Sequence, residues 1–306
     1  MRRSPFRLAA FVVAGTLVTG CSTVVSGTAT PDPEALEIRL NTGGLPTEPR
    51  TPETSNTQQK VLAANELADR MVLPTDLDPS FTRPGMLSVR AVVQSGNLKN
   101  TLEDADAERI GQRGLLYGFV SGRNTSAEKV DSGITMIVLR MTDDGAASGV
   151  VDDFRSKGGG SEVVDGRTEW AVRKAGPKQY QDYTVFTAYM AIGPLVVIAV
   201  PWADDEARAR GMVPRAMDAQ ARLLAGFTSA GRAELAGLPA DKEAIVSYTV
   251  APEPIEAGKF ESDYGFRGRR AALHWDSSPV ETAKLFEEVG MDLAGVGRNT
   301  VFRAGR

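Results

Sequence analysis

The chain has 306 residues, of which 35 are Lys or Arg, 39 are Asp or Glu and one is His, and 42% of its residues are hydrophobic. A formal net charge of −4 argues against nucleic acid as a partner, because phosphate binding needs a basic surface. The composition is that of a globular protein with one or two domains.

The first 20 residues are predicted to be a signal peptide. Arg2, Arg3 and Arg7 precede an apolar run, 8–18, which is shorter than the roughly 20 residues that cross a bilayer core. Without residues 1–20, which hold three arginines and no acid, the chain keeps 32 basic and 39 acidic residues. We therefore expect an exported protein with a more acidic mature form.

The segment Val18-Thr19-Gly20-Cys21 looks like a bacterial lipobox and ends in the single cysteine of the chain. Small residues at Thr19 and Gly20 give a signal peptidase access to the bond before Cys21, and the thiol can carry a thioether-linked diacylglycerol. The sequence thus predicts a lipoprotein, acylated at Cys21 with palmitate-type chains and anchored to the extracytoplasmic face of the cell membrane. A cleaved signal peptide with an incidental cysteine is the alternative. The single cysteine excludes thiol catalysis and cysteine metal sites from the folded part.

Residues 21–56 are predicted to form a tether. They are rich in Ser, Thr, Gly and Pro and have too few large apolar residues to build a core. Such a segment would hold the folded part away from the membrane.

Residues 57–231 are predicted to form an α+β domain, with helices packed on a mostly antiparallel sheet. Thr142 is the expected N-cap of the third helix, and Gly211 and Pro214 are expected to divide the last helical stretch. In 182–192, alternate residues should point to opposite faces of the sheet. We expect helices over 58–72, 102–113 and 143–157 and after Trp202, and strands over 86–94, 116–120, 134–141, 162–173, 182–192 and 195–200.

Residues 232–306 are predicted to form a smaller α/β unit. Its length of about 75 residues is near the limit for an independent core, so the unit either packs on the first domain or is incomplete. We expect strands over 244–250, 270–275 and 300–304, and a helix over 279–289.

Two sets of residues are candidates for a site. His274 is the single histidine, which excludes His-His metal sites. It is either a structural histidine or a base or ligand contact. Trp170, Tyr180, Tyr183, Tyr189 and Trp202 either belong to the core or form an aromatic groove for an apolar or glycan ligand. We expect no cofactor and no metal, because no nucleotide or calcium motif is complete.

Several segments resemble an uncharacterised family of actinobacterial, mycobacterial-type lipoproteins. They are 25–29 with the sequence Val-Ser-Gly-Thr-Ala, 115–122, and 272–304 with His274-Trp275 and Asn-Thr-Val-Phe-Arg-Ala at 299–304. In that family a similar first domain precedes a longer second one, so the second unit here is expected to be truncated. The resemblance implies a location in the cell envelope and supplies no active site.

The sequence favours a non-enzymatic, membrane-anchored envelope protein that binds a ligand or a protein partner. A cell-wall-directed hydrolase that uses a pair of carboxylates about 5 to 9 Å apart is one alternative. A purely structural envelope component is the other.

Overall fold

The computed structural model describes residues 44–305, apart from 46, 53, 100, 126–129, 158–160, 177–179, 181 and 252–263. The chain divides into two compact units, Met1–Gly44 and Leu45–Arg306, and the fold below is that of the second. The predicted signal peptide, the lipobox with Cys21 and most of the tether therefore lie outside the described residues. Within the described residues, no helix combines the length and the apolar character needed to cross a membrane.

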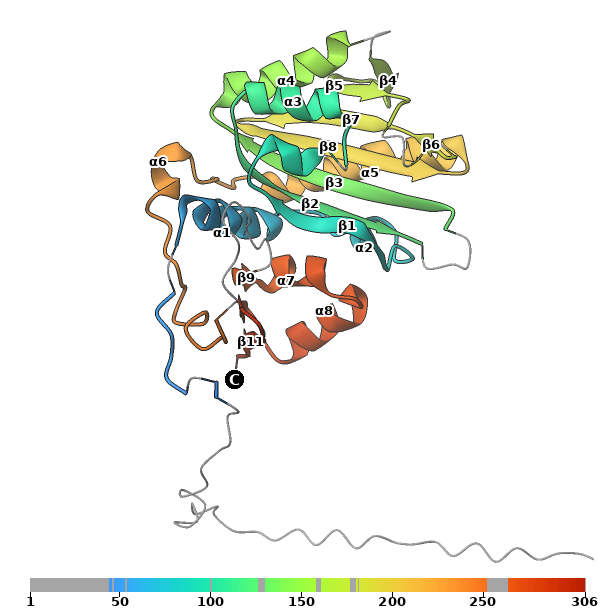
Figure 1. The fold of residues 1–306 in the computed structure, drawn as a ribbon. Helices are drawn as coiled ribbons and strands as arrows, with labels where there is room; N and C mark the ends of the chain where they lie inside the picture. The colour runs from blue at the N-terminus through green and yellow to red at the C-terminus, as the bar shows by residue number, and fades with distance from the viewer. Residues whose placement is uncertain are drawn as a thin grey trace, which may run out of the picture. The chain divides into compact units, whose positions relative to one another are not determined.

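The second unit is built on an eight-stranded sheet with the order β1-β2-β3-β8-β7-β5-β4, in which β6 also pairs with β8 (Figure 1). All the strand pairs of this sheet are antiparallel, as predicted. The strands are β1 Arg83–Val92, β2 Leu115–Asn124, β3 Ser132–Met141, β4 Glu162–Val164, β5 Arg167–Arg173, β6 Thr184–Val185, β7 Thr187–Ile192 and β8 Leu195–Ala203.

Apolar residues on both faces of the sheet create two cores. In β8, Val197 belongs to one core and its neighbours Val196 and Ile198 belong to the other, and every residue of the strand is buried. Because side chains alternate along a strand, a fully apolar strand requires cover on both faces. The predicted alternation in 182–192 is confirmed, since Phe186 and Ala188 lie in the first core and Val185 and Tyr189 in the second.

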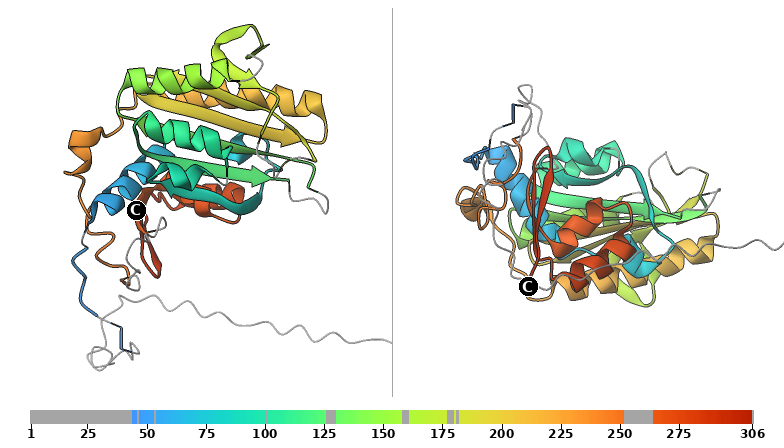
Figure 2. Two further views of the ribbon diagram at one scale, coloured as in Figure 1. Left: turned by 45° about the horizontal axis from the view of Figure 1, so that its top comes forward. Right: turned by 90° about the horizontal axis from the view of Figure 1, so that it is seen from below.

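Helices supply this cover, so the unit has three layers. On one face lie α3 Asp104–Gln112 and α4 Asp144–Ser156, with the 3-10 helix η2 Ser95–Leu98. On the other face lie α1 Asn56–Ala68, α2 Pro74–Leu77, α5 Glu206–Leu224 and α6 Arg232–Leu235. Figure 2 shows the sheet between the two helical layers.

A smaller antiparallel sheet follows in the sequence and packs against α1. Its strands are β9 Gly265–Gly268, β10 Leu293–Val296 and β11 Thr300–Arg303, in the order β11-β10-β9. Two helices, α7 Arg269–Trp275 and α8 Pro279–Glu288, connect β9 to β10. Leu62 of α1 contacts Phe266 and Leu293 in a small apolar cluster. The predicted helix over 279–289 and strand over 300–304 are confirmed, and the predicted boundary at residue 232 stays a prediction.

The predicted strand over 270–275 is wrong, because these residues belong to helix α7. The Asp69 carboxylate accepts hydrogen bonds from the backbone N–H groups of Gly268 and Ala271, at 3.1 and 2.8 Å. These are the groups that begin the helix, and their partner lies about 200 residues earlier in the chain. The residues that neighbour His274 in the sequence therefore give no indication of this contact with Asp69.

The predicted strand over 244–250 is also wrong, and this segment forms turns. Glu243 and Ala244 have φ angles of 53° and 61°, in the left-handed region that a strand cannot contain. The Asp241 carboxylate accepts hydrogen bonds from the backbone N–H groups of Val246 and Ser247, at 2.7 and 2.8 Å. A side chain thus closes the turn in place of a neighbouring strand.

Three local predictions need smaller corrections. The strand over 162–173 is a hairpin, because Asp165 and Gly166 both have positive φ and make a two-residue turn between β4 and β5. The N-cap of α4 is Asp143, not Thr142, since the Asp143 carboxylate accepts from Ala146 N at 2.8 Å. Helix α5 runs through Pro214 without a break, because its buried face packs on the sheet along its whole length.

Candidate functional site

The predicted aromatic groove does not appear as a shared exposed surface. Trp170 belongs to the core on the α5 side of the sheet, whereas Tyr189 and Trp202 belong to the core on the opposite side, and all three are buried. Tyr183 packs against Trp202, with ring centroids 4.7 Å apart, and its hydroxyl donates to Val130 O at 3.0 Å. Core packing accounts for these side chains, and ligand contact by them stays a prediction that their burial does not favour.

His274 is fully buried beneath β2. Its Nε2 lies 3.2 Å from Ala68 O, so this nitrogen donates, and its Nδ1 accepts from the Ser121 hydroxyl at 2.7 Å. Burial, helped by the positive charge of Arg270, lowers the pKa of His274 to about 3. A neutral, doubly hydrogen-bonded imidazole inside the protein has a structural role.

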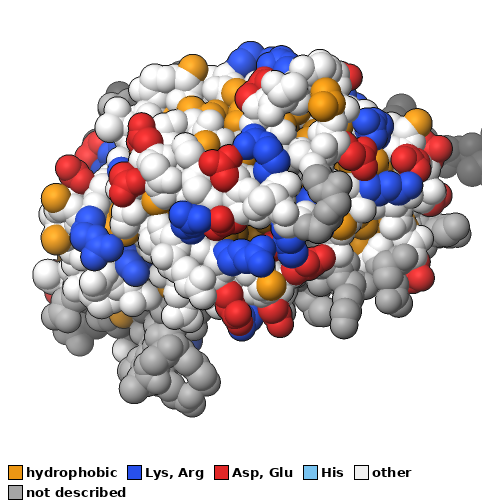
Figure 3. Space-filling model, turned by 90° about the horizontal axis from the view of Figure 1, so that it is seen from above, with side chains coloured by type: hydrophobic (Ala, Val, Ile, Leu, Met, Phe, Trp, Pro, Cys, Tyr) orange, Lys and Arg blue, Asp and Glu red, His pale blue; other side chains and the backbone are white. Residues whose placement is uncertain are grey.

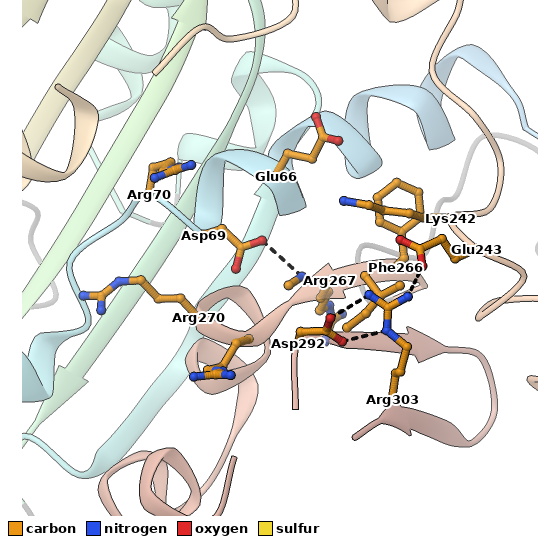
Figure 4. Close-up of a pocket in the computed structure, with 13 residues that line it drawn as sticks. Glu66, Asp69, Arg70, Lys242, Glu243, Phe266, Arg267, Arg270, Asp292 and Arg303 are labelled. Atoms are coloured by element: carbon orange, nitrogen blue, oxygen red, sulfur yellow. Dashed lines mark hydrogen bonds and ion pairs between the residues drawn. The ribbon is translucent and has the colours of Figure 1, made fainter. Parts of the chain in front are cut away.

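A polar cleft of about 420 Å³ lies between α1 and the small sheet (Figure 4). Figure 4 shows that its side chains come from α1, from the turn at Lys242 and Glu243, and from the small sheet with α7. Within the described residues, no three His, Cys, Asp or Glu side chains are close enough to hold a metal ion. Six of the thirteen lining residues are basic and four are acidic: Arg70, Lys242, Arg267, Arg269, Arg270 and Arg303, and Glu66, Asp69, Glu243 and Asp292.

Two of the acids are held by one arginine. Arg303 donates from Nε and Nη2 to the two carboxylate oxygens of Asp292, each at 2.7 Å, and also pairs with Glu243. This two-pronged contact lowers the pKa of Asp292. Both acids therefore share the single positive charge of Arg303.

The third acid, Asp69, lies at the end of α1 and serves the backbone of α7 as described above. Burial raises its pKa, although the hydrogen bonds from Ala271 and Gly268 act in the opposite direction. Losing this carboxylate would leave N–H groups of α7 without an acceptor, so Asp69 is a structural group.

The fourth acid, Glu66, lies one turn before Asp69 on the same side of α1. Burial raises its pKa, and the positive charge of Lys242 acts against that shift. The Glu66 side chain accepts no hydrogen bond from the described residues. It is thus the one acid of the cleft that is not committed to a partner within the described chain.

The basic residues outnumber the acids of the cleft, and several of them have no carboxylate in an ion pair of the described residues. Arg270 donates from Nε to Met71 O at 2.6 Å and pairs with Asp76, and Arg269 donates to Met291 O at 2.5 Å. The charge of Arg269 also helps to lower the pKa of Asp292. Arg70 lies over the Phe227 ring at 5.8 Å. The side chains of Arg70 and Lys242 donate no hydrogen bond within the described residues. The cleft is thus locally positive on a protein whose net charge is negative.

This cleft has no contiguous signal in the sequence, because its lining residues are spread from Glu66 to Arg303. The run Arg267-Gly268-Arg269-Arg270 was the available local signal, since it places three arginines within four residues. Arg267 lies over the Trp275 ring at 4.2 Å and is nearly buried, so this run supplies both structural and exposed arginines.

A family model described as the N-terminal part of a domain of unknown function, DUF7373, matches residues 50–240. The chain belongs to the DUF7373 family. The match includes α1 to α6 and the whole large sheet, and excludes the small sheet. The cleft therefore joins a wall from the DUF7373 N-terminal domain, on α1, to a wall from the residues that follow it.

No curated protein matches the chain. Among solved structures, the extracellular domain of PknH from Mycobacterium tuberculosis matches with 10% identity and a TM-score of 0.34. That match covers 57% of this chain and 97% of the PknH domain. A TM-score at this level does not establish a shared fold.

Proposed function

We propose that this DUF7373 protein is an actinobacterial lipoprotein, anchored through Cys21 to the extracytoplasmic face of the cell membrane, and that its folded unit is a non-enzymatic binding protein. The anchor is supported by the sequence of residues 1–21, in which a basic start, a short apolar run and small residues precede the single cysteine.

The observation that carries the binding role is the state of the acids in the cleft. A glycosidase that works through carboxylates needs one acid and one base or nucleophile, about 5 to 9 Å apart. Here Asp69 holds the α7 backbone, and Asp292 and Glu243 hold Arg303, so Glu66 has no second uncommitted acid beside it. A cleft whose acids are engaged and whose bases are available is suited to binding rather than to hydrolysis.

Cys21→Ala tests the anchor. The full chain and the variant would be produced in an actinobacterial host grown with a clickable palmitate analogue. We expect the label on the wild-type protein in the membrane fraction, and no label on Cys21→Ala. Label on the variant would disprove acylation at this residue.

Native mass spectrometry of the full chain in detergent, followed by solvent extraction, tests the binding role. A stoichiometric adduct that the solvent releases would support a ligand-binding protein. A bare mass would argue against a retained small ligand and direct the search to protein partners of the lipidated chain in the membrane.

A further inference from the structure

We infer that the cleft between α1 and the small sheet binds a small hydrophilic anion that carries phosphate or carboxylate groups. This inference rests on the proposed binding role and specifies its ligand class. It depends on three features: the charges that remain available, the nature of the walls and the spacing of the basic groups.

The charges that remain available are mainly positive. Arg303 is used by Asp292 and Glu243, and Arg270 by Asp76. That leaves Lys242, Arg70 and Arg269 without a carboxylate partner in any ion pair of the described residues, against the two acids Glu66 and Asp69. An anion would restore the balance of charge in the cleft.

The walls make such an interaction stronger than at an open surface. Burial raises the pKa of both Glu66 and Asp69, which indicates that the α1 wall is partly shielded from water. Charge interactions strengthen as the local dielectric falls. Guanidinium and ammonium groups are the side chains that proteins use to bind carboxylate and phosphate oxygens.

The lining also indicates that the ligand is hydrophilic. Phe266 and Leu293 are the apolar side chains among the thirteen lining residues. A site for an acyl chain would be lined mainly by apolar groups. A volume of about 420 Å³ is sufficient for a small organic anion or for the head group of a phospholipid.

The basic groups are spread along the cleft. In Figure 4, Arg70 and Lys242 lie on opposite sides of Asp69. A ligand with two or more anionic groups would reach both sides. We therefore expect citrate to bind more tightly than inorganic phosphate.

A second basic depression, between α3 and α4, provides the control surface. Its Arg113 donates two hydrogen bonds to Asp153, at 2.8 and 2.6 Å, and its Lys157 is held by Glu103 and Asp106. Arg109 and Arg113 are both exposed, and Arg109 is in no ion pair of the described residues. Figure 3 shows acidic and basic side chains interspersed over the upper face of the molecule, with no patch of a single sign.

Isothermal titration calorimetry of the full chain in detergent, at low ionic strength, tests the inference with citrate, inorganic phosphate and neutral glycerol as probes. We expect citrate and phosphate to bind and glycerol to give no heat. Lys242→Glu and Arg70→Glu should each weaken citrate binding at least about tenfold, because each replaces an attractive charge with a repulsive one. Arg109→Glu makes the same charge change on α3 and should leave the affinity unchanged.

Lys242→Gln removes a charge without adding one, so it should weaken citrate binding less than Lys242→Glu. Circular dichroism would establish that each variant folds. Absence of citrate and phosphate binding to the wild-type chain would overturn the inference, as would an equal loss in Arg109→Glu.

Native mass spectrometry and calorimetry together distinguish the absence of an anion site from the absence of a binding role. A neutral glycan or lipid adduct in native mass spectrometry, with no binding of citrate or phosphate, would reject the anion and keep the role. Absence of both an adduct and probe binding would reject the anion and any retained small ligand, and would leave a protein partner as the form of the binding role. An anionic adduct that partitions into the organic phase would be a phospholipid bound through its head group, and one in the aqueous phase would be a free anion.

Discussion

The two sheets of this protein are stabilised in different ways. The large sheet has strands of up to ten residues and is covered by helices on both faces, so its interior is mainly apolar. The small sheet has strands of four residues, and Phe302 on its edge strand is 52% exposed. Its contacts with α1 combine the small apolar cluster around Leu62 with hydrogen bonds made by Gln58, Asn65 and Asp69. The large sheet thus provides stability, whereas the small sheet provides a charged wall for the cleft.

Replacing a phenylalanine by alanine in each sheet should show most strongly that the two sheets are stabilised differently. Phe119→Ala in β2 removes a fully buried ring that packs edge-on against His274 and Trp275, and should lower the free energy of unfolding by about 3 to 5 kcal/mol. Phe302→Ala in β11 should cost less than about 1 kcal/mol, because half of that ring is already in water. Urea denaturation of both variants measures this, and similar losses would contradict the comparison.

Asp69→Ala should release α7 without unfolding the large sheet. The variant removes the acceptor of the Gly268 and Ala271 N–H groups and should cost about 1 to 2 kcal/mol. Hydrogen exchange should increase in α7 and remain slow in β8. Asp69→Asn keeps one oxygen acceptor and should show a smaller increase. Faster exchange throughout the large sheet would mean that the two sheets unfold as one.

Acid should weaken the protein through His274. The unfolded chain takes up a proton at the ordinary histidine pKa of about 6.5, but the folded protein does so at a pKa of about 3. Stability from the neutral imidazole is therefore fully present above about pH 6.5 and is lost as the pH falls toward 3. Between about pH 7.5 and about pH 5.5 we expect a loss of about 1.4 kcal/mol.

Urea denaturation at the two pH values checks this loss. The difference between them should shrink in His274→Gln, which cannot take up the proton. An unchanged difference in that variant would assign the pH dependence to other groups.

The smallest expected effect is a gain in stability from a substitution in α5, which packs on the large sheet. Gly211 lies in α5 with open space where a Cβ would be, so Gly211→Ala should stabilise the protein by about 0.5 to 1 kcal/mol. Gly149→Ala in α4 is the matched control, since its Cβ would come within 2.8 Å of Arg113 Nη1. Thermal denaturation should show a higher midpoint for Gly211→Ala than for Gly149→Ala. The reverse order would contradict this account.

The two regions also differ in how far the sequence predicts them. The strands over 134–141 and 195–200 were predictable because a continuous apolar run indicates a strand that is buried on both faces. Helix α8 was predictable because Pro279 marks its start.

The region around the cleft was not predictable in this way, because its local structure depends on distant partners. Asp69 begins a helix 200 residues later, and Asp241 closes a turn that the apolar residues 244–246 predicted as a strand. The site was missed for the same reason. The aromatic side chains were predicted to form a possible groove, but they belong to the cores. The cleft is built from charged residues, and in the sequence nothing distinguishes them from ordinary surface residues.

The position of α1 between the two sheets has a consequence for the order in which the chain can fold. One side of α1 packs on the large sheet through Val61, Ala64 and Leu67, and Leu62 packs on the small sheet. The Asn65 side chain donates to Phe266 O, 201 residues further along the chain. A chain leaves the ribosome or an export channel from its N-terminus. Both sides of α1 can therefore be covered only after nearly the whole protein has emerged. Contacts this distant in sequence form slowly. During that interval Leu62 and Asn65 lack their partners in the small sheet.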